Sequence, residues 1–243
     1  MKNSTKYLLA AGLVLLASLT AYNMALRAEY RRGDYKNPLR GYVTQRFRDF
    51  TEVVVPASNV VSVKIVPGPF SVRLNPGAAE HVHLRQEGNR LVITATFPKW
   101  RRYFGPAETV LISCPRLAAL TTDAVYKSEG KPLTTKEFSA RDYTKVLVQG
   151  FRQDSLTLRQ DHGSCIELAG NTLGLLRATA GASPGSHGLL QLAADNHLAA
   201  ASLTLAHQSE LVLENVRIPQ LHRQFSDSAK VTLTGAALGS VLQ

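Results

Sequence analysis

The chain is poor in the residues and motifs that announce enzymatic chemistry. Its 243 residues include two cysteines, two methionines and one tryptophan. A phosphate-binding loop and a dinucleotide fingerprint are absent from the sequence, and two cysteines are too few for a disulfide framework. We therefore predict a protein that is not an enzyme, with no catalytic residue, no metal ligand and no cofactor.

The two cysteines are predicted to remain free thiols. Cys114 continues the alternation of Val110 and Ile112 and is expected to face the core, whereas Cys165 is out of phase with Ile166 and is expected to face away. A disulfide needs Cα atoms within about 7 Å of each other. Side chains that face opposite ways do not meet this requirement.

An evenly distributed basic surface is also lacking, although the formal net charge is +10. Residues 1–48 hold nine Lys and Arg against two acids, which gives +7, and residues 49–243 hold nineteen against sixteen, which gives +3. The excess is therefore concentrated near the N-terminus and is not spread over a folded face. This distribution argues against nucleic acid as a partner.

The N-terminal segment has the length and composition of a membrane anchor. The run from Tyr7 to Leu26 is apolar apart from Ser18, Thr20 and Asn23, and twenty helical residues span about 30 Å, enough to cross a bilayer core. We assign residues 1–26 as a signal-anchor or transmembrane helix, with a cleaved signal peptide as the alternative. A small-x-small cleavage site is hard to find near its end.

Residues 27–48 form a basic, juxtamembrane linker that makes the membrane orientation ambiguous. The positive-inside rule would leave the following domain in the cytoplasm, but long domains are translocated regardless of charge. The basic residues could instead contact anionic head groups. We expect a membrane-anchored envelope protein whose soluble domain is periplasmic or extracellular, with a cytoplasm-facing sensor domain as an alternative.

The second half of the chain repeats a short apolar pair at a nearly constant interval. The first members of the five pairs are separated by 20, 24, 21 and 20 residues and are Val146, Ile166, Leu190, Leu211 and Val231. Such a period is typical of a solenoid, in which each coil buries its inward side chains against its neighbours. The pattern predicts that these five residues form one inward column.

Two further sets of apolar residues are expected inside each coil. The second set is Leu156, Leu158, Leu176, Ala178, Leu203, Leu205, Leu221 and Val241, and the third is Phe151, Leu173, Leu198, Val216 and Leu238. The segment Gly181 to Ser186 is interpreted as the enlarged corner of the 24-residue coil.

Residues 49–243 are expected to form one all-β domain with a single core. Alternation of period two begins near Thr51 and is interrupted by turn signals such as Pro67-Gly68 and Asn75-Pro76-Gly77. We assign residues 49–114 as N-terminal strands that cap one end of the stack and residues 115–243 as solenoid coils. In the first coil, Val125 falls 21 residues before Val146.

The order of these segments resembles a known family. An F-x-x-hydrophobic start at Phe47 to Phe50 is followed by Arg90-Leu91-Val92-Ile93 and by Val110 to Leu117, which leads into the repeats. This order is similar to the family of putative auto-transporter adhesins with a head GIN domain, in its membrane-anchored form. The resemblance covers roughly residues 47–243. It implies a right-handed single-stranded β-helix in the envelope of Gram-negative bacteria, and it carries no catalytic residues.

Histidines near successive corners form the one arrangement in which a metal ladder is conceivable. They are His162, His187 and His207, with Asp227 at the equivalent place in the next coil. Stacked strands lie about 4.8 Å apart, but a straight ladder supplies poorly the tetrahedral geometry that zinc requires. Exposed polar corner residues are the simpler interpretation.

The acidic residues do not form the pair of carboxylates that a carbohydrate-active β-helix enzyme, a lyase or a glycosidase, would need. They occupy mostly different phases of the repeat, and the outward column of Glu167, Gln191, Val212 and Thr232 contains a single acid. We therefore favour non-catalytic adhesion or scaffolding through the β-helix faces and keep that enzyme class as the alternative. The expected partners are the membrane, through the N-terminal helix, and an envelope glycan, lipid or protein.

The segment from Pro98 to Pro106 has the most distinctive local composition. It holds the single tryptophan of the chain, and its candidate binding residues are Trp100, Arg101, Arg102, Tyr103 and Phe104. Trp, Tyr and Arg dominate interface energies, and aromatic rings stack on sugars and sit at membrane interfaces. The alternative is that Trp100 and Phe104 fold back to cover the open end of the β-helix.

Overall fold

The computed structural model describes residues 3–33, 39–99, 104, 108–136 and 144–241. The chain divides into two compact units, Met1–Tyr42 and Val43–Gln243. The first unit contains one long helix, and the second is mostly β. The β content and the N-terminal apolar helix agree with the sequence prediction.

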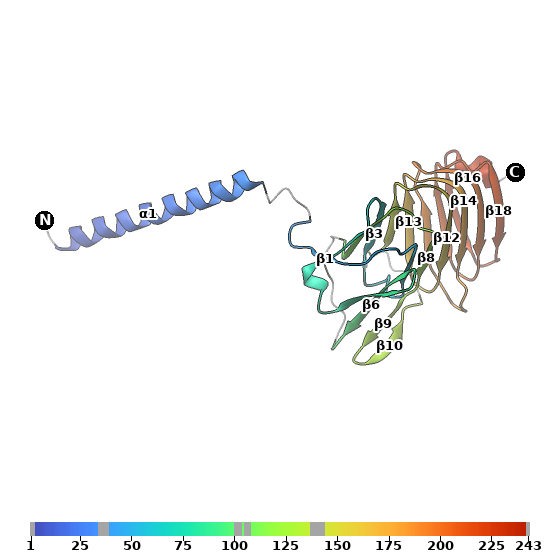
Figure 1. Cartoon of the computed structure of the whole chain (residues 1–243), viewed down its shortest axis with the longest axis horizontal. Coiled ribbons are helices and arrows are strands. Elements are labelled where there is room, and N and C mark those ends of the chain that lie inside the picture. The colour runs from blue at the N-terminus through green and yellow to red at the C-terminus, as the bar shows by residue number, and fades with distance from the viewer. Residues whose placement is uncertain (1–2, 34–38, 100–103, 105–107, 137–143, 242–243) are drawn as a thin grey trace. The chain divides into compact units, whose positions relative to one another are not determined.

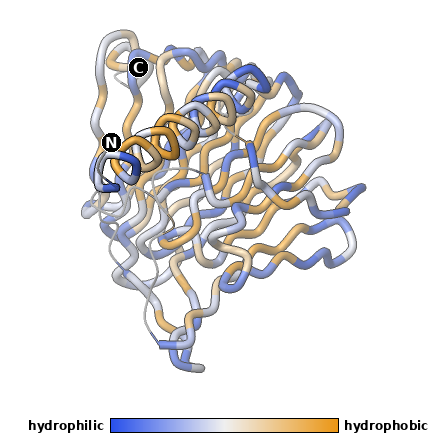
Figure 2. Tube along the Cα trace, turned by 90° about the vertical axis from the view of Figure 1, so that its left-hand side faces the viewer, coloured by the Kyte–Doolittle hydropathy of each residue, from blue (hydrophilic) through white to orange (hydrophobic). Residues whose placement is uncertain are grey.

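Helix α1 (Asn3–Arg32) has 30 residues, none of them buried. Its middle is apolar and its two ends are hydrophilic (Figure 2). The hydroxyls of Ser18 and Thr20 donate to the carbonyls of Val14 and Leu16, each over 2.8 Å, so neither polar side chain is left unsatisfied on the apolar surface. The helix is long and apolar enough to cross a membrane, a property that a signal sequence near the N-terminus shares. It continues past Leu26 into the basic segment, where Arg31 and Arg32 complement its C-terminal dipole.

Two mixed β-sheets make up the second unit, and their strands are stacked side by side (Figure 1). The nine-stranded sheet has the spatial order β1 (Val43–Gln45), β4 (Ser71–Leu74), β7 (Val110–Cys114), β3 (Val63–Pro67), β11 (Val146–Gln149), β13 (Cys165–Ala169), β15 (Leu189–Leu192), β17 (Glu210–Glu214) and β19 (Lys230–Thr234).

The ten-stranded sheet has the spatial order β10 (Lys131–Thr134), β9 (Val125–Ser128), β6 (Arg90–Phe97), β2 (Glu52–Val55), β8 (Ala119–Thr122), β12 (Arg152–Gln160), β14 (Thr172–Ala180), β16 (His197–Leu205) and β18 (Gln220–Phe225). In addition, β5 (Val82–Glu87) pairs with β6. Two short helices, η2 (Pro76–Ala78) and α2 (Ala237–Val241), complete the described elements.

From β11 onward, successive strands alternate between the two sheets. From β13 onward, each strand also pairs in parallel with the strand one repeat earlier. The register aligns Val146, Ile166, Leu190, Leu211 and Val231 as direct neighbours. This confirms the predicted column. Its first four members are buried, and Val231 in the last strand is partly exposed.

The predicted second and third sets are only partly right. The register aligns Leu156 with Leu176 and Ala201, so Leu203 belongs two residues further along, beside Ala178. Leu173 and Leu198 are neighbours as predicted, but the residue aligned with them in β12 is Gln153. Leu238 lies in α2 and is 48% exposed. Hydropathy alone misplaced these residues because buried polar and small side chains take positions that the pattern reserved for leucine.

The N-terminal strands enter both sheets in an order that the sequence did not predict. Strand β3 lies between β7 and β11, and β2 lies between β6 and β8. The neighbour of Val146 is therefore Val63, and Val125 belongs to β9 in the other sheet. Antiparallel pairs are confined to this N-terminal part: β1 with β4, β4 with β7, β5 with β6, and β9 with β10. One apolar core extends through both sheets, and among the described strands β1 and β10 contribute no side chain to it.

Candidate binding groove

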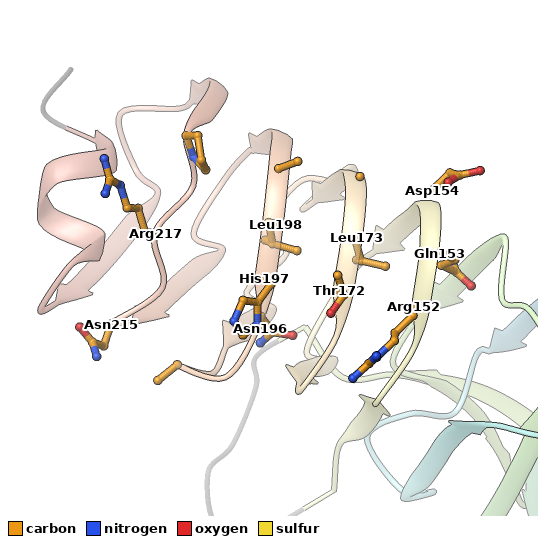
Figure 3. Close-up of a pocket in the computed structure, with 14 residues that line it drawn as sticks. Arg152, Gln153, Asp154, Thr172, Leu173, Asn196, His197, Leu198, Asn215 and Arg217 are labelled. Carbon is orange, nitrogen blue, oxygen red and sulfur yellow. The ribbon is translucent and has the colours of Figure 1, made fainter.

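A groove with a volume of about 830 Å³ crosses the beginnings of β12, β14 and β16 and the segment before β18. Its charged and hydrogen-bonding side chains include Arg152, Asp154, Thr172, His197, Asn215 and Arg217. Figure 3 shows Arg152 and Arg217 at opposite ends of this row of strands.

A bend shared by the three strands makes the surface concave. The register pairs Gln153 with Leu173 and Ser155 with Leu175, and it leaves Asp154 and Gly174 unpaired between them. A Cβ atom at Gly174 would lie 2.7 Å from the carbonyl oxygen of Asp154, which is too close for any other residue. Glycine is therefore required where neighbouring strands approach each other at the bend.

The floor of the groove is rigid because it rests on the core. Leu173 is 2% exposed and Leu198 is 4% exposed. Beneath them, the buried side chain of Asn171 accepts from the N–H of Phe151 over 3.0 Å and donates to the carbonyl of Val148 over 3.0 Å. It also donates to Oδ1 of Asn196 over 3.0 Å. Each asparagine thus joins one coil to the next at the same corner.

The groove carries more positive than negative charge. Arg152 and Arg217 make no ion pair with any residue that the structure describes, and both are exposed. Asp154 is the single acidic side chain among the lining residues. A glycosidase needs two carboxylates flanking the scissile bond, so the described lining lacks the second of these groups. The arrangement is suited to holding an extended anionic chain across successive strands.

Each of the three corner histidines interacts with protein groups close to it. His162 Nδ1 lies 2.6 Å from Asp123 Oδ1, and His187 Nε2 lies 3.1 Å from Glu210 Oε1. The carbonyl of His207 accepts hydrogen bonds from two serine hydroxyls. His162 and His207 both have positive φ, at 45° and 54°, so they occupy tight turns. Among the described residues, no group of three or more His, Cys, Asp or Glu side chains could hold a metal ion.

The sequence of the enlarged corner at 181–185 matches Gly-x-Ser-x-Gly, the pattern of the nucleophile elbow in hydrolases. That motif requires a strand–turn–helix, whereas this segment joins β14 to β15. Ser183 Oγ donates to Asp161 Oδ2 over 2.5 Å. Burial raises the pKa of Asp161, but hydrogen bonds from the side chain and backbone of Ser183 and from the backbone of His162 outweigh it, so the pKa lies below its ordinary value. The serine stabilises this turn.

Both cysteines are free and buried. Cys114 belongs to the core as predicted. Cys165 lies on the side of β13 opposite Ile166, as its phase predicted, and it is not part of the apolar core. It is nevertheless only 5% exposed, so facing away from the core does not expose it. Its strand neighbour Leu189 flanks it on the outer face of the sheet. Burial raises the pKa of each thiol to about 12.

Of the five predicted loop residues, Trp100, Arg101, Arg102 and Tyr103 lie outside the described residues. Phe104 is partly buried and packs against the core. Its ring is stacked 6.0 Å from that of Phe97 and lies 6.3 Å from the ring of His81. This position agrees with the capping interpretation for Phe104.

Comparisons with known proteins show no family for this chain. No family model and no curated protein matches the chain. A putative adhesin from Bacteroides fragilis has a TM-score of 0.48 and 10% identity, covering 81% of this chain and 99% of its own. A putative adhesin from Parabacteroides distasonis has a TM-score of 0.36 and 12% identity, covering 80% of this chain and 81% of its own. A putative lipid binding protein from the same species has a TM-score of 0.31 and 11% identity, covering 82% of this chain and 96% of its own. The names include adhesins, but none specifies a head GIN domain or an auto-transporter.

Proposed function

We propose that this chain is a membrane-anchored envelope protein that binds an extended anionic glycan in the groove across β12, β14 and β16. The observation that supports the proposal is the position of two arginines, Arg152 and Arg217, at the two ends of a groove that crosses consecutive strands. Neither arginine forms an ion pair with another described residue. The function is adhesion or scaffolding without catalysis.

Arginine suits a carboxylated sugar because its planar guanidinium binds a carboxylate through two parallel hydrogen bonds. Between the arginines, Thr172 and Asn215 offer a hydroxyl and an amide to sugar hydroxyls, and His197 offers a ring nitrogen. Parallel strands lie about 4.8 Å apart, so similar contacts recur along the groove. A linear polymer with repeated charges matches this repetition.

We further infer the finer architecture that this function needs. Residues 1–26 anchor the chain, residues 27–48 form the basic linker, and residues 49–243 form a β-helix whose coils wind in the right-handed sense. The alternation of strands between two sheets supports the coil, and the length and apolar composition of α1 support the anchor. We place the domain on the periplasmic or extracellular side, where glycans are found.

The experiment measures binding of the full chain in nanodiscs to polygalacturonate, with neutral dextran as the comparison. We expect saturable, salt-sensitive binding to polygalacturonate alone. Arg152→Ala and Arg217→Ala should each weaken it by about tenfold, a loss typical of one charge-assisted contact. Arg177→Ala, at an exposed position of β14 outside the groove, is the matched control.

Three results would contradict the proposal. If dextran bound as tightly as polygalacturonate, charge would not determine recognition. If Arg177→Ala weakened binding as much as Arg152→Ala and Arg217→Ala do, the groove would not be the binding site. Accumulation of unsaturated or reducing ends during incubation would instead support the carbohydrate-active alternative. An alkaline-phosphatase fusion after residue 50 tests the orientation, because an inactive fusion would place the domain in the cytoplasm.

A further inference from the structure

A second cleft, of about 450 Å³, lies outside the groove, on the N-terminal part of the ten-stranded sheet. It is lined by residues of β5, β6, β9 and β10 and by Pro56. Strand β2 ends at Val55, one residue before this proline. Beyond that point β9 takes the place of β2 beside β6, pairing Thr96 with Lys127. The cleft is therefore formed where one strand leaves the sheet and another replaces it.

The register shows which side chains share the outer face at this point. Val92, Thr94 and Thr96 alternate with the buried residues of β6, so all three face outward. Thr94 is paired with His83 of β5 and Thr96 with Lys127 of β9. Two threonine hydroxyls are thus flanked by a basic side chain on each side.

The rest of the cleft is apolar. Its walls include Pro56, Val92, Val125, Tyr126 and Pro132. The ring of Tyr126 is held edge-on, 5.7 Å from that of the buried Phe97, which fixes this wall against the core. A pocket with apolar walls and a few convergent polar groups is the usual form of a small-molecule site.

Charge determines which kind of small molecule fits. The lining includes three basic residues, His83, Arg85 and Lys127, and no acidic one. Arg85 forms an ion pair with Glu87, whereas His83 and Lys127 have no acidic partner among the described residues. Both basic side chains are exposed, so a ligand can reach them without moving the backbone. The Lys127 ammonium group and the His83 imidazole, which have no acidic partner among the described residues, thus lie beside Thr96 and Thr94, at one part of an otherwise apolar surface.

We propose that this cleft binds a single-chain anionic amphiphile of the fatty-acid class. The carboxylate lies over Thr96, between His83 and Lys127, and accepts hydrogen bonds from the Thr96 hydroxyl and from the Lys127 ammonium group. The Thr94 hydroxyl at the edge of this position already donates to the carbonyl of His83 over 3.4 Å. The alkyl chain lies along Val92, Val125 and Pro56. This site is separate from the anionic-glycan groove, because the two share no lining residue.

The test uses the full chain in phosphatidylcholine nanodiscs and a photoactivatable dodecanoate, with cross-linked peptides mapped by mass spectrometry. We expect saturable labelling of the peptides that contain residues 92–96 or 125–132, and unlabelled laurate should abolish it. Dodecanol and dodecyltrimethylammonium should compete at least about tenfold more weakly, since neither carries the anion that the charged contacts recognise.

Charge variants locate the head group. Lys127→Glu and His83→Glu should each reduce labelling about tenfold. Lys131→Glu is the matched control, because it reverses an exposed charge on the same hairpin outside the cleft. Should Lys127→Glu fail to fold, as judged by circular dichroism, Lys127→Met removes the charge and retains the aliphatic stem. Equal competition by dodecanol, equal loss in Lys131→Glu, or labels on other peptides would each overturn the proposal.

Discussion

Replacing Asn171 with leucine should destabilise the β unit although it adds apolar surface to a buried site. Asn171 is 0% exposed and joins three partners: the N–H of Phe151, the carbonyl of Val148 and the side chain of Asn196. Leucine would leave the N–H of Phe151 without a partner and would remove the side-chain donor to the carbonyl of Val148, which keeps its place in the ladder between β11 and β13. Each buried, unsatisfied group costs about 1–3 kcal/mol, whereas burying a leucine side chain contributes about 1.5–3 kcal/mol.

The leucine also differs from asparagine in shape, and overpacking adds about 1–3 kcal/mol. We therefore expect a net loss of about 1–3 kcal/mol in the free energy of unfolding. Urea unfolding of the full chain in nanodiscs, followed by the far-ultraviolet strand signal, measures this difference. Thr179→Ala, at an exposed position of β14, the strand that follows Asn171, is the control and should change stability by less than about 0.5 kcal/mol.

Native-state hydrogen exchange separates this explanation from a general packing defect. In Asn171→Leu the amide of Phe151 should lose protection, while the amides of β17, two coils away in the other sheet, should follow only the global change in stability. Unchanged stability of the leucine variant, with Phe151 still protected, would refute the argument that asparagine side chains connect the coils.

Three other predictions concern single positions. Ile166→Asp should cost several kcal/mol because it places an unpaired charge in the core, while Gln191→Asp on the outer face should be mild; equal urea midpoints for the two variants would reject the register. Gly174→Ala should lower the free energy of unfolding by about 1–3 kcal/mol in the same assay and weaken polygalacturonate binding, since its Cβ would meet the carbonyl of Asp154. Unchanged stability and binding would contradict the close approach of β12 and β14 at this position. Because the pKa of Asp161 is lowered on folding, its contribution is present above the unfolded pKa and is lost as pH falls through the folded value. The destabilisation in Asp161→Asn should therefore be larger at pH 7 than at pH 3, and a pH-independent difference would count against it.

The repeat of apolar pairs was sufficient to predict one complete column of the core. Val146, Ile166, Leu190 and Leu211 are large and apolar, and their spacing follows directly from the length of each coil. The columns at the opposite sheet were harder to predict, since Ala201 and Gln153 occupy places that hydropathy assigns to larger apolar residues. Asn171 and Asn196 are stable in the interior because their side chains are hydrogen-bonded there. A hydropathy pattern carries no information about hydrogen-bond partners and therefore does not predict their burial.

Strand order could not be predicted because alternation indicates a strand without indicating its neighbour. Val63 and Val125 both begin suitable segments, and the structure pairs Val146 with Val63. The groove was missed for a related reason. Arg152 and Arg217 are unremarkable in the sequence, and only the shared bend at Gly174 brings residues from several coils to one concave surface.

The position of β3 between β7 and β11 determines an order of assembly. The hydroxyl of Thr144, just before β11, donates to the carbonyl of Asn59, just before β3, across 85 residues of chain. Closing so long a loop costs entropy before any contact compensates for it, whereas each later coil pairs with a strand made only about twenty residues earlier. We therefore expect folding of the β unit to have a slow, non-local first step followed by rapid local additions. Growth should then proceed away from the N-terminus, with the last strands, β18 and β19, joining when the rest of the stack already provides a template.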